Sequence, residues 1–143
     1  MKPKLIIIQG IPASGKSTWA RKMALENPNE YVIVNRDGIR SMLGKYWVPV
    51  REGLVTNIEE QSVLAGINAG YAVLLDATNL NPKALRRWTY LSEEHEFDIE
   101  YKEFKVPLRK AIFRDWWRGF KGGRKVGAKV IRSFYERYYV EPK

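Results

Sequence analysis

Four short apolar runs divide the chain and are typical of strands buried on both faces of a parallel sheet. They are rich in β-branched or aromatic residues and occupy residues 5–8, 31–34, 71–75 and 97–106. Between them, apolar residues recur every three or four positions, which predicts helices. This alternation predicts a single α/β domain over residues 1–143, with a parallel sheet of about four strands and right-handed crossovers that put helices on both faces.

The predicted helices have recognisable limits. One over about residues 16–25 should end before Pro28, because proline cannot continue it, and Asn81 with Pro82 opens another that ends near Glu93. A helix from Pro107 is expected to break at Gly119. A last helix is expected over about residues 128–139. Three further expectations concern packing. A helix over about residues 51–69 is indicated by helical spacing in Leu54, Ile58, Gln61, Val63, Leu64 and Ile67. The last strand is expected to have Phe97, Ile99, Tyr101 and Phe104 on one side, and Trp47 is interpreted as core or rim packing.

A phosphate-binding loop joins the first strand to the first helix. The residues match the Walker A pattern G-x-x-x-x-G-K-[ST] at every fixed position: Gly10, Ile11, Pro12, Ala13, Ser14, Gly15, Lys16 and Ser17. The glycines permit a tight turn whose backbone N–H groups converge on phosphate oxygens at the positive end of a helix. Lys16 is expected to reach the β- and γ-phosphates of a nucleoside triphosphate, and Ser17 to offer its hydroxyl to Mg²⁺. The loop through Thr18 is therefore predicted to bind nucleotide.

Composition and charge narrow the class of protein. There is no cysteine and only one histidine, so a disulfide framework or a thiolate or histidine metal cluster is excluded. The longest aliphatic run is too short to span a bilayer and no signal-peptide core follows Met1, so no membrane association and a cytoplasmic setting are expected. The net charge of +9 lies entirely in residues 101–137, either as a solvated basic face or as a surface that meets phosphates.

Two carboxylates follow predicted strands at the edge where ligands bind in open α/β sheets. Asp37 is the candidate to take a proton from an acceptor hydroxyl, with a helix cap as its alternative role. Arg40 lies three residues on and can grip an acceptor phosphate or form a structural ion pair. Asp76 can hold Mg²⁺ through water, orient Arg40, or be purely structural.

Arg114 and Arg118 precede a segment rich in glycine and basic residues. They are four apart on a predicted helix, and the segment over residues 119–127 has the composition of a mobile basic loop. We interpret this region as a basic lid that folds over the nucleotide and neutralises transition-state charge, with a solvated basic helix as the alternative.

Five stretches resemble, in order along nearly the whole chain, the 5′-kinase domain of the phage polynucleotide kinase family. They are residues 10–21, 35–40, 76–82, Arg114 with Arg118, and 130–135. The resemblance implies transfer of the γ-phosphoryl group of ATP to the 5′-hydroxyl of DNA or RNA, with Mg²⁺ as cofactor. It also implies roles for single residues: Asp37 as general base, Arg40 and Asp76 on the acceptor side, Lys16 and Ser17 at the nucleotide and metal, and Arg118 in the lid.

Two other functions stay open at this point. One is a kinase that phosphorylates a hydroxyl on a small molecule or a modified base. The other is a nucleic-acid-binding module that hydrolyses nucleoside triphosphates. Oligomeric state is not indicated by any pattern in the sequence.

Overall fold

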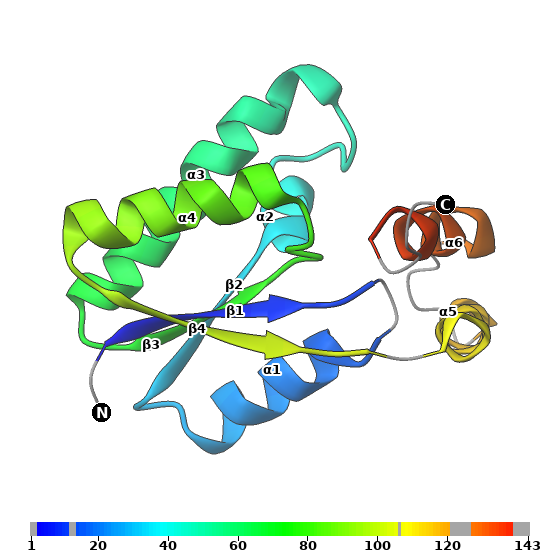
Figure 1. The fold of residues 1–143 in the computed structure, drawn as a ribbon, viewed down its shortest axis with the longest axis horizontal. Helices are drawn as coiled ribbons and strands as arrows, with labels where there is room; N and C mark the ends of the chain where they lie inside the picture. The colour runs from blue at the N-terminus through cyan, green and yellow to red at the C-terminus, as the bar shows by residue number, and fades with distance from the viewer. Residues whose placement is uncertain (1–2, 12–13, 106, 121–126, 139–143) are drawn as a thin grey trace.

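Four parallel strands form the centre of the computed structural model, which describes residues 3–11, 14–105, 107–120 and 127–138. The strands are β1 (Lys4–Gln9), β2 (Tyr31–Asn35), β3 (Ala72–Asp76) and β4 (Asp98–Glu103). They pair in the order β2-β3-β1-β4 (Figure 1). The predicted α/β domain with a parallel sheet of four strands is confirmed.

Helices cover both faces of the sheet and one of its ends. One face carries α1 (Lys16–Glu26). The other carries α2 (Arg36–Met42), α3 (Glu52–Asn68), which follows the short 3₁₀ helix η1 (Pro49–Arg51), and α4 (Pro82–His95). The last two helices, α5 (Leu108–Phe120) and α6 (Ala128–Tyr138), lie beyond the carboxyl ends of β1 and β4 (Figure 1). The carboxyl edge of the sheet therefore faces a second layer of helices.

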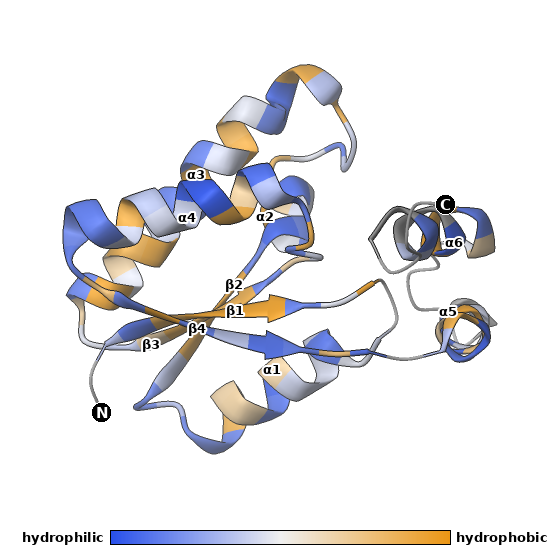
Figure 2. Cartoon of the chain, viewed as in Figure 1, coloured by the Kyte–Doolittle hydropathy of each residue, from blue (hydrophilic) through white to orange (hydrophobic). Residues whose placement is uncertain are grey.

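The alternation of side chains in β1 explains the two main hydrophobic clusters, because successive residues of a strand point to opposite faces. Leu5 and Ile7 pack with residues of α2, α3 and α4, whereas Ile6 and Ile8 pack with Ala20 of α1. The central strands are accordingly hydrophobic along most of their length (Figure 2).

A third, smaller cluster attaches the last two helices to the phosphate loop. Ile11 of the loop is fully buried against Ala111 of α5 and Ile131 of α6. Leu108 and Ile112 of α5 pack around this contact. The region predicted as a lid is thus tied to the loop through an apolar side chain of the loop itself.

Three expectations, one on a helix end and two on packing, were wrong in detail. The helix α5 continues through Gly119 to Phe120, since one glycine costs a helix only about 1 kcal/mol and need not end it. Phe104 lies seven positions from Phe97 and so on the opposite face, where its ring is 5.7 Å from that of Trp19. The buried face of α3 is formed by Val55, Glu59 and Val63 rather than by Leu54.

Candidate active site

The phosphate loop needs glycine at both fixed positions for different physical reasons. Gly15 has φ of 97° and is the N-cap of α1, a left-handed conformation that side chains with a Cβ disfavour. A Cβ on Gly10 would lie 2.5 Å from Ser14 Oγ and 3.1 Å from the carbonyl oxygen of Phe104. Pro12 and Ala13, predicted to belong to the nucleotide site, lie outside the described residues.

Lys16 and Ser14 place polar groups in the buried part of this loop. Lys16 opens α1 and is almost fully buried. Burial lowers the pKa of Lys16; the carboxylates of Asp76 and Asp37 act in the opposite direction, and Arg118 lowers it further. Ser14 Oγ is buried, and no hydrogen-bond partner for it occurs among the described residues. The loop therefore holds a desolvated cation and an unsatisfied hydroxyl, both suited to phosphate oxygens.

Asp76 and Asn35 meet at the carboxyl ends of adjacent strands. Their Cα atoms are partners in the pairing of β2 with β3, and Asn35 Nδ2 donates to Asp76 Oδ2 at 2.8 Å. On the other side, Asp76 is in register with Ile8 of β1, just before the phosphate loop. The parallel register thus brings a buried carboxylate beside the loop.

The residues at this edge fit a magnesium ion held together with nucleotide phosphates. Mg²⁺ prefers oxygen ligands and usually takes one or two from the protein and others from phosphates and water. Ser17, in the first turn of α1, and Asp76 offer such oxygens. Within the described part of the chain, no group of three or more His, Cys, Asp or Glu residues could hold a metal ion by itself.

Asp37 lies in the first turn of α2, immediately after β2. Its Oδ1 accepts hydrogen bonds from Arg40 Nη1 at 2.8 Å and from the Tyr46 hydroxyl at 2.6 Å. The N-cap of α2 is Asn35, whose Oδ1 accepts from the Gly38 amide at 2.6 Å. The alternative interpretation of Asp37 as the cap of this helix is therefore wrong.

Arg40 is held by a residue that the sequence interpretation missed. Glu52, the first residue of α3, accepts from Arg40 Nε at 3.1 Å and from Arg40 Nη2 at 2.6 Å. These hydrogen bonds raise the pKa of Arg40 and lower the pKa of Glu52. The hydrogen bonds described for Arg40 go to Asp37 and Glu52, whereas the hydrogen bond described for Asp76 comes from Asn35.

A second ion-pair network fixes α2 against α3. Arg36 donates to Glu59 at 3.2 Å and to the Thr56 hydroxyl at 3.1 Å, and Arg87 of α4 approaches the same carboxylate at 3.5 Å. Burial raises the pKa of Glu59, against the opposing effect of Arg36 and Arg87. Glu59 lies four residues from Val55 and four from Val63, so it shares their buried face of α3. An acidic residue on an apolar helix face was the signal in the sequence from which a buried ion pair could have been predicted.

The predicted lid contacts the phosphate loop directly through α5. Arg114 Nη1 donates to the backbone carbonyl oxygen of Ser14 at 3.3 Å. Arg118 pairs with Asp115 at 2.9 Å, and the buried Asp115 also accepts from the Gly127 amide at 2.7 Å. Arg114 therefore contacts the loop, and Arg118 lies close enough to Lys16 to affect its pKa. The basic residues Lys121, Arg124 and Lys125 lie outside the described residues.

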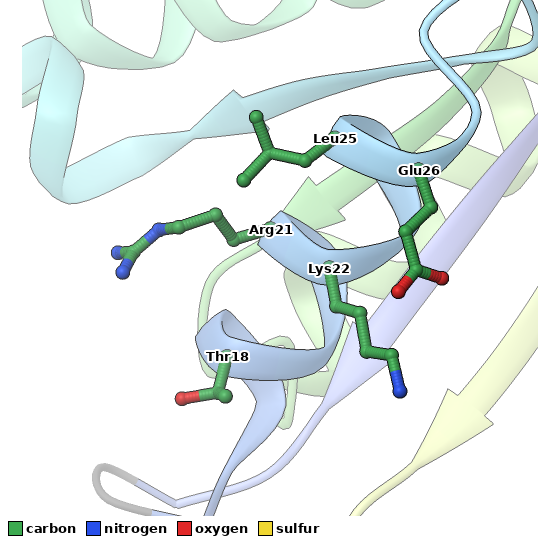
Figure 3. Close-up of a pocket in the computed structure, with 5 residues that line it drawn as sticks. All are labelled: Thr18, Arg21, Lys22, Leu25 and Glu26. Carbon is green, nitrogen blue, oxygen red and sulfur yellow. The ribbon is translucent and has the colours of Figure 1, made fainter.

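A shallow hollow runs along the outer side of α1. It is lined by Thr18, Arg21, Lys22, Leu25 and Glu26 (Figure 3). Thr18, predicted to bind nucleotide, is exposed here and points to the same side of the helix as Arg21. Lys16, Asp37 and Asp76 are not among the residues that line this hollow.

Comparison with known proteins identifies a family and structures with the same fold. Residues 5–140 match the AAA domain family. A chain of the Pnkp1/Rnl/Hen1 RNA repair complex superposes with a TM-score of 0.83 at 31% identity, over 96% of this chain and 45% of that one. An APS kinase of Mycobacterium tuberculosis shares the fold, with a TM-score of 0.68 at 16% identity over 86% of this chain and 74% of that one.

Two curated relatives are similar at the level of sequence. A protein of Autographa californica nuclear polyhedrosis virus, named as a bifunctional polynucleotide kinase/RNA ligase, is 26% identical over 94% of this chain and 21% of its own length. L-seryl-tRNA(Sec) kinase of Methanococcus maripaludis is 26% identical over 94% of this chain and 52% of its own length. The chain thus spans about half or less of the length of these two curated relatives. None of the helices described here is long and apolar enough to cross a membrane.

Proposed function

The chain belongs to the AAA domain family and is a P-loop kinase domain, and from this premise we propose that it transfers the γ-phosphoryl group of ATP to the 5′-hydroxyl end of a DNA or RNA strand. The observation that carries the proposal is the hydrogen bond of 2.8 Å between Asp37 and Arg40, beside Lys16. It joins a carboxylate that can accept a proton to a guanidinium that can bind an acceptor phosphate. The similarity to a chain of an RNA repair complex supports a nucleic acid as the acceptor.

In this proposal each residue has a separate role in one displacement. Asp37 takes the proton of the 5′-hydroxyl while the hydroxyl oxygen forms a bond to the γ-phosphorus. At the same time the bond between the γ-phosphorus and the bridging oxygen breaks, and ADP leaves with that oxygen. Lys16 and Arg118 neutralise the charge that develops on the phosphates, and Arg114 holds the loop in shape through Ser14. Mg²⁺, as P-loop kinases generally use it, supplies further charge neutralisation when bound through Ser17, with Asp76 near.

The acceptor is tested with γ-labelled ATP, Mg²⁺ and an oligonucleotide that carries a 5′-hydroxyl. We expect label on the strand, no label on the same strand with a methylated 5′-oxygen, and no transfer by the Lys16→Ala variant. Label that persists on the blocked strand would place the acceptor hydroxyl elsewhere. Phosphate release without a labelled acceptor would instead indicate a nucleotide-hydrolysing binding module.

A kinase for another hydroxyl is the second candidate. It is favoured by the similarity to L-seryl-tRNA(Sec) kinase, which extends over 94% of this chain. The same labelled ATP, offered with a mixture of small hydroxyl compounds or charged tRNA, separates this candidate from the first.

A further inference from the structure

Trp47 is a large aromatic side chain that the fold leaves exposed beside the acceptor-side ion pairs. It lies in the segment between α2 and η1, and 53% of its surface is accessible, so it is not a core residue. Its described contact is with Arg40, whose Cζ lies 5.6 Å from the ring centroid. A cation–π contact at an exposed site contributes only about 0.5–1 kcal/mol, which is little for a side chain of this size.

The ring stands close to the carboxylate that would accept the proton. Arg40 touches Trp47 on one side and donates to Asp37 at 2.8 Å on the other. Tyr46, the neighbour of Trp47, donates to the same carboxylate at 2.6 Å. One guanidinium group therefore contacts both the aromatic ring and Asp37, so the ring and the carboxylate belong to one cluster of side chains.

Other apolar side chains close to Trp47 in the chain are exposed as well. Met42, at the end of α2, and Val50 and Leu54, in η1 and at the start of α3, are also largely exposed. Figure 2 shows hydrophobic residues at the start of α3 and in the segment that leads to it. Exposed apolar and aromatic side chains in one part of the surface favour a flat, poorly solvated ligand group over a charged one.

We propose that Trp47 is the platform on which the base of the 5′-terminal nucleotide of the acceptor stacks. The inference rests on the proposed function and deepens it: Arg40 binds phosphate, Asp37 meets the 5′-hydroxyl, and Trp47 recognises the base by its face. Stacking on an aromatic ring tolerates every base, because each has a π face. Trp47 therefore selects for a nucleobase at the 5′ end without selecting its sequence.

The test compares two acceptors that differ only in the terminal base. Both are 5′-hydroxyl oligonucleotides of one length, and one has an abasic 5′-terminal residue. Trp47→Ala should raise KM for the ordinary acceptor by roughly 5- to 150-fold, the range for loss of one stacked base, and should change kcat little. With the abasic acceptor, the KM of Trp47→Ala should stay near the KM of the wild type for that same acceptor. Trp47→Phe should retain most of the affinity of the wild type for the ordinary acceptor.

Controls separate stacking from packing and from failure of the proposed function. Tyr90→Ala removes an exposed aromatic ring from α4, away from the site, and should leave both KM values unchanged. An equal rise in KM for both acceptors would mean that Trp47 only positions Arg40, and no rise for either would mean that the ring has no part in acceptor binding; both overturn the inference. If the wild type labels neither acceptor, the proposed function fails and the stacking inference with it.

Discussion

At the scale of single residues, Lys16 combines a functional requirement with a cost in stability. Its ammonium group is buried beneath the phosphate loop, and burial lowers its pKa more than the carboxylates of Asp76 and Asp37 raise it. A charge in that position is destabilising for the folded state without nucleotide, and bound phosphates would offset the cost.

Lys16→Met should therefore abolish transfer and yet raise the free energy of unfolding of the nucleotide-free protein. Because the pKa of Lys16 is lower in the folded than in the unfolded chain, the unfolded chain binds more protons between the folded pKa and 10.5. The free energy of unfolding of the wild type should thus increase relative to that of the variant as pH rises through this window. Denaturant melts of both proteins at several pH values measure the difference, and a variant less stable than the wild type at pH 7 would contradict the argument.

Asp37 offers a second test at this scale. Asp37→Asn keeps an oxygen that can accept from Arg40 and Tyr46 but cannot take a proton, so kcat should fall by roughly 10²–10⁴-fold with little change in ATP affinity. Single-turnover transfer and ATP titration measure the two quantities. Glu93→Gln, an exposed carboxylate on α4, is the matched control. Near-normal turnover of Asp37→Asn would remove the general-base assignment.

At the scale of elements, α3 determines where the acceptor-side groups lie. Glu52 holds Arg40, and Glu59 holds Arg36, so the short helix α2 is fixed by carboxylates from one neighbouring helix. The contact of α3 with the sheet sets this geometry. Gly66 allows a close approach, since a Cβ there would lie 2.7 Å from Val73 Cγ2 and 3.3 Å from Val32 Cγ2.

Two glycine substitutions in α3 should have opposite effects on stability. Gly66→Ala should lower the free energy of unfolding by about 1–3 kcal/mol, because the buried, β-branched Val73 cannot move aside at low cost. Gly53→Ala meets nothing within 4 Å and should raise it, by up to about 1 kcal/mol. Chemical denaturation of both variants tests the pair. Equal effects would mean that helix propensity, not contact with the sheet, dominates in α3.

At the scale of the whole molecule, some of the positive charge of residues 101–137 is engaged in contacts within the protein. Arg114 donates to Ser14 and Arg118 pairs with Asp115, although both arginines are exposed, as are Arg109 on α5 and Lys129 on α6. Only part of the excess charge is thus available to an extended strand. We expect an acceptor to contact a few phosphates rather than many.

The salt dependence of acceptor affinity measures that number. On single strands, each phosphate contact adds about 0.7 to the slope of log affinity against log salt concentration. We expect a slope equivalent to a few contacts, lowered by about one contact in Arg40→Ala and unchanged in Arg118→Ala, whose turnover should fall instead. Loss of acceptor affinity in Arg118→Ala with normal turnover at saturation would exchange the roles of these two arginines.

The sequence by itself determined the elements and the residues that adjoin the phosphate loop. Hydrophobic periodicity located the four strands, and because parallel strands bring their carboxyl ends to one edge, the positions of Lys16, Asp37 and Asp76 in the chain were enough to predict that they meet. Their catalytic roles remain predictions. Local patterns suffice here because each of these residues lies in the loop, at the end of a strand or just after one.

Only the tertiary structure decided which charged groups pair and which aromatic residues stay exposed. The contact of Arg114 with Ser14 joins residues 100 positions apart, and Glu52 reaches Arg40 across a turn of irregular chain. Neither spacing corresponds to a helical or strand period, so neither could be read locally. Trp47 has a large aromatic side chain of the kind that is usually buried. Its exposure follows from where α2 and α3 place the segment between them, so it is a consequence of packing rather than of sequence pattern.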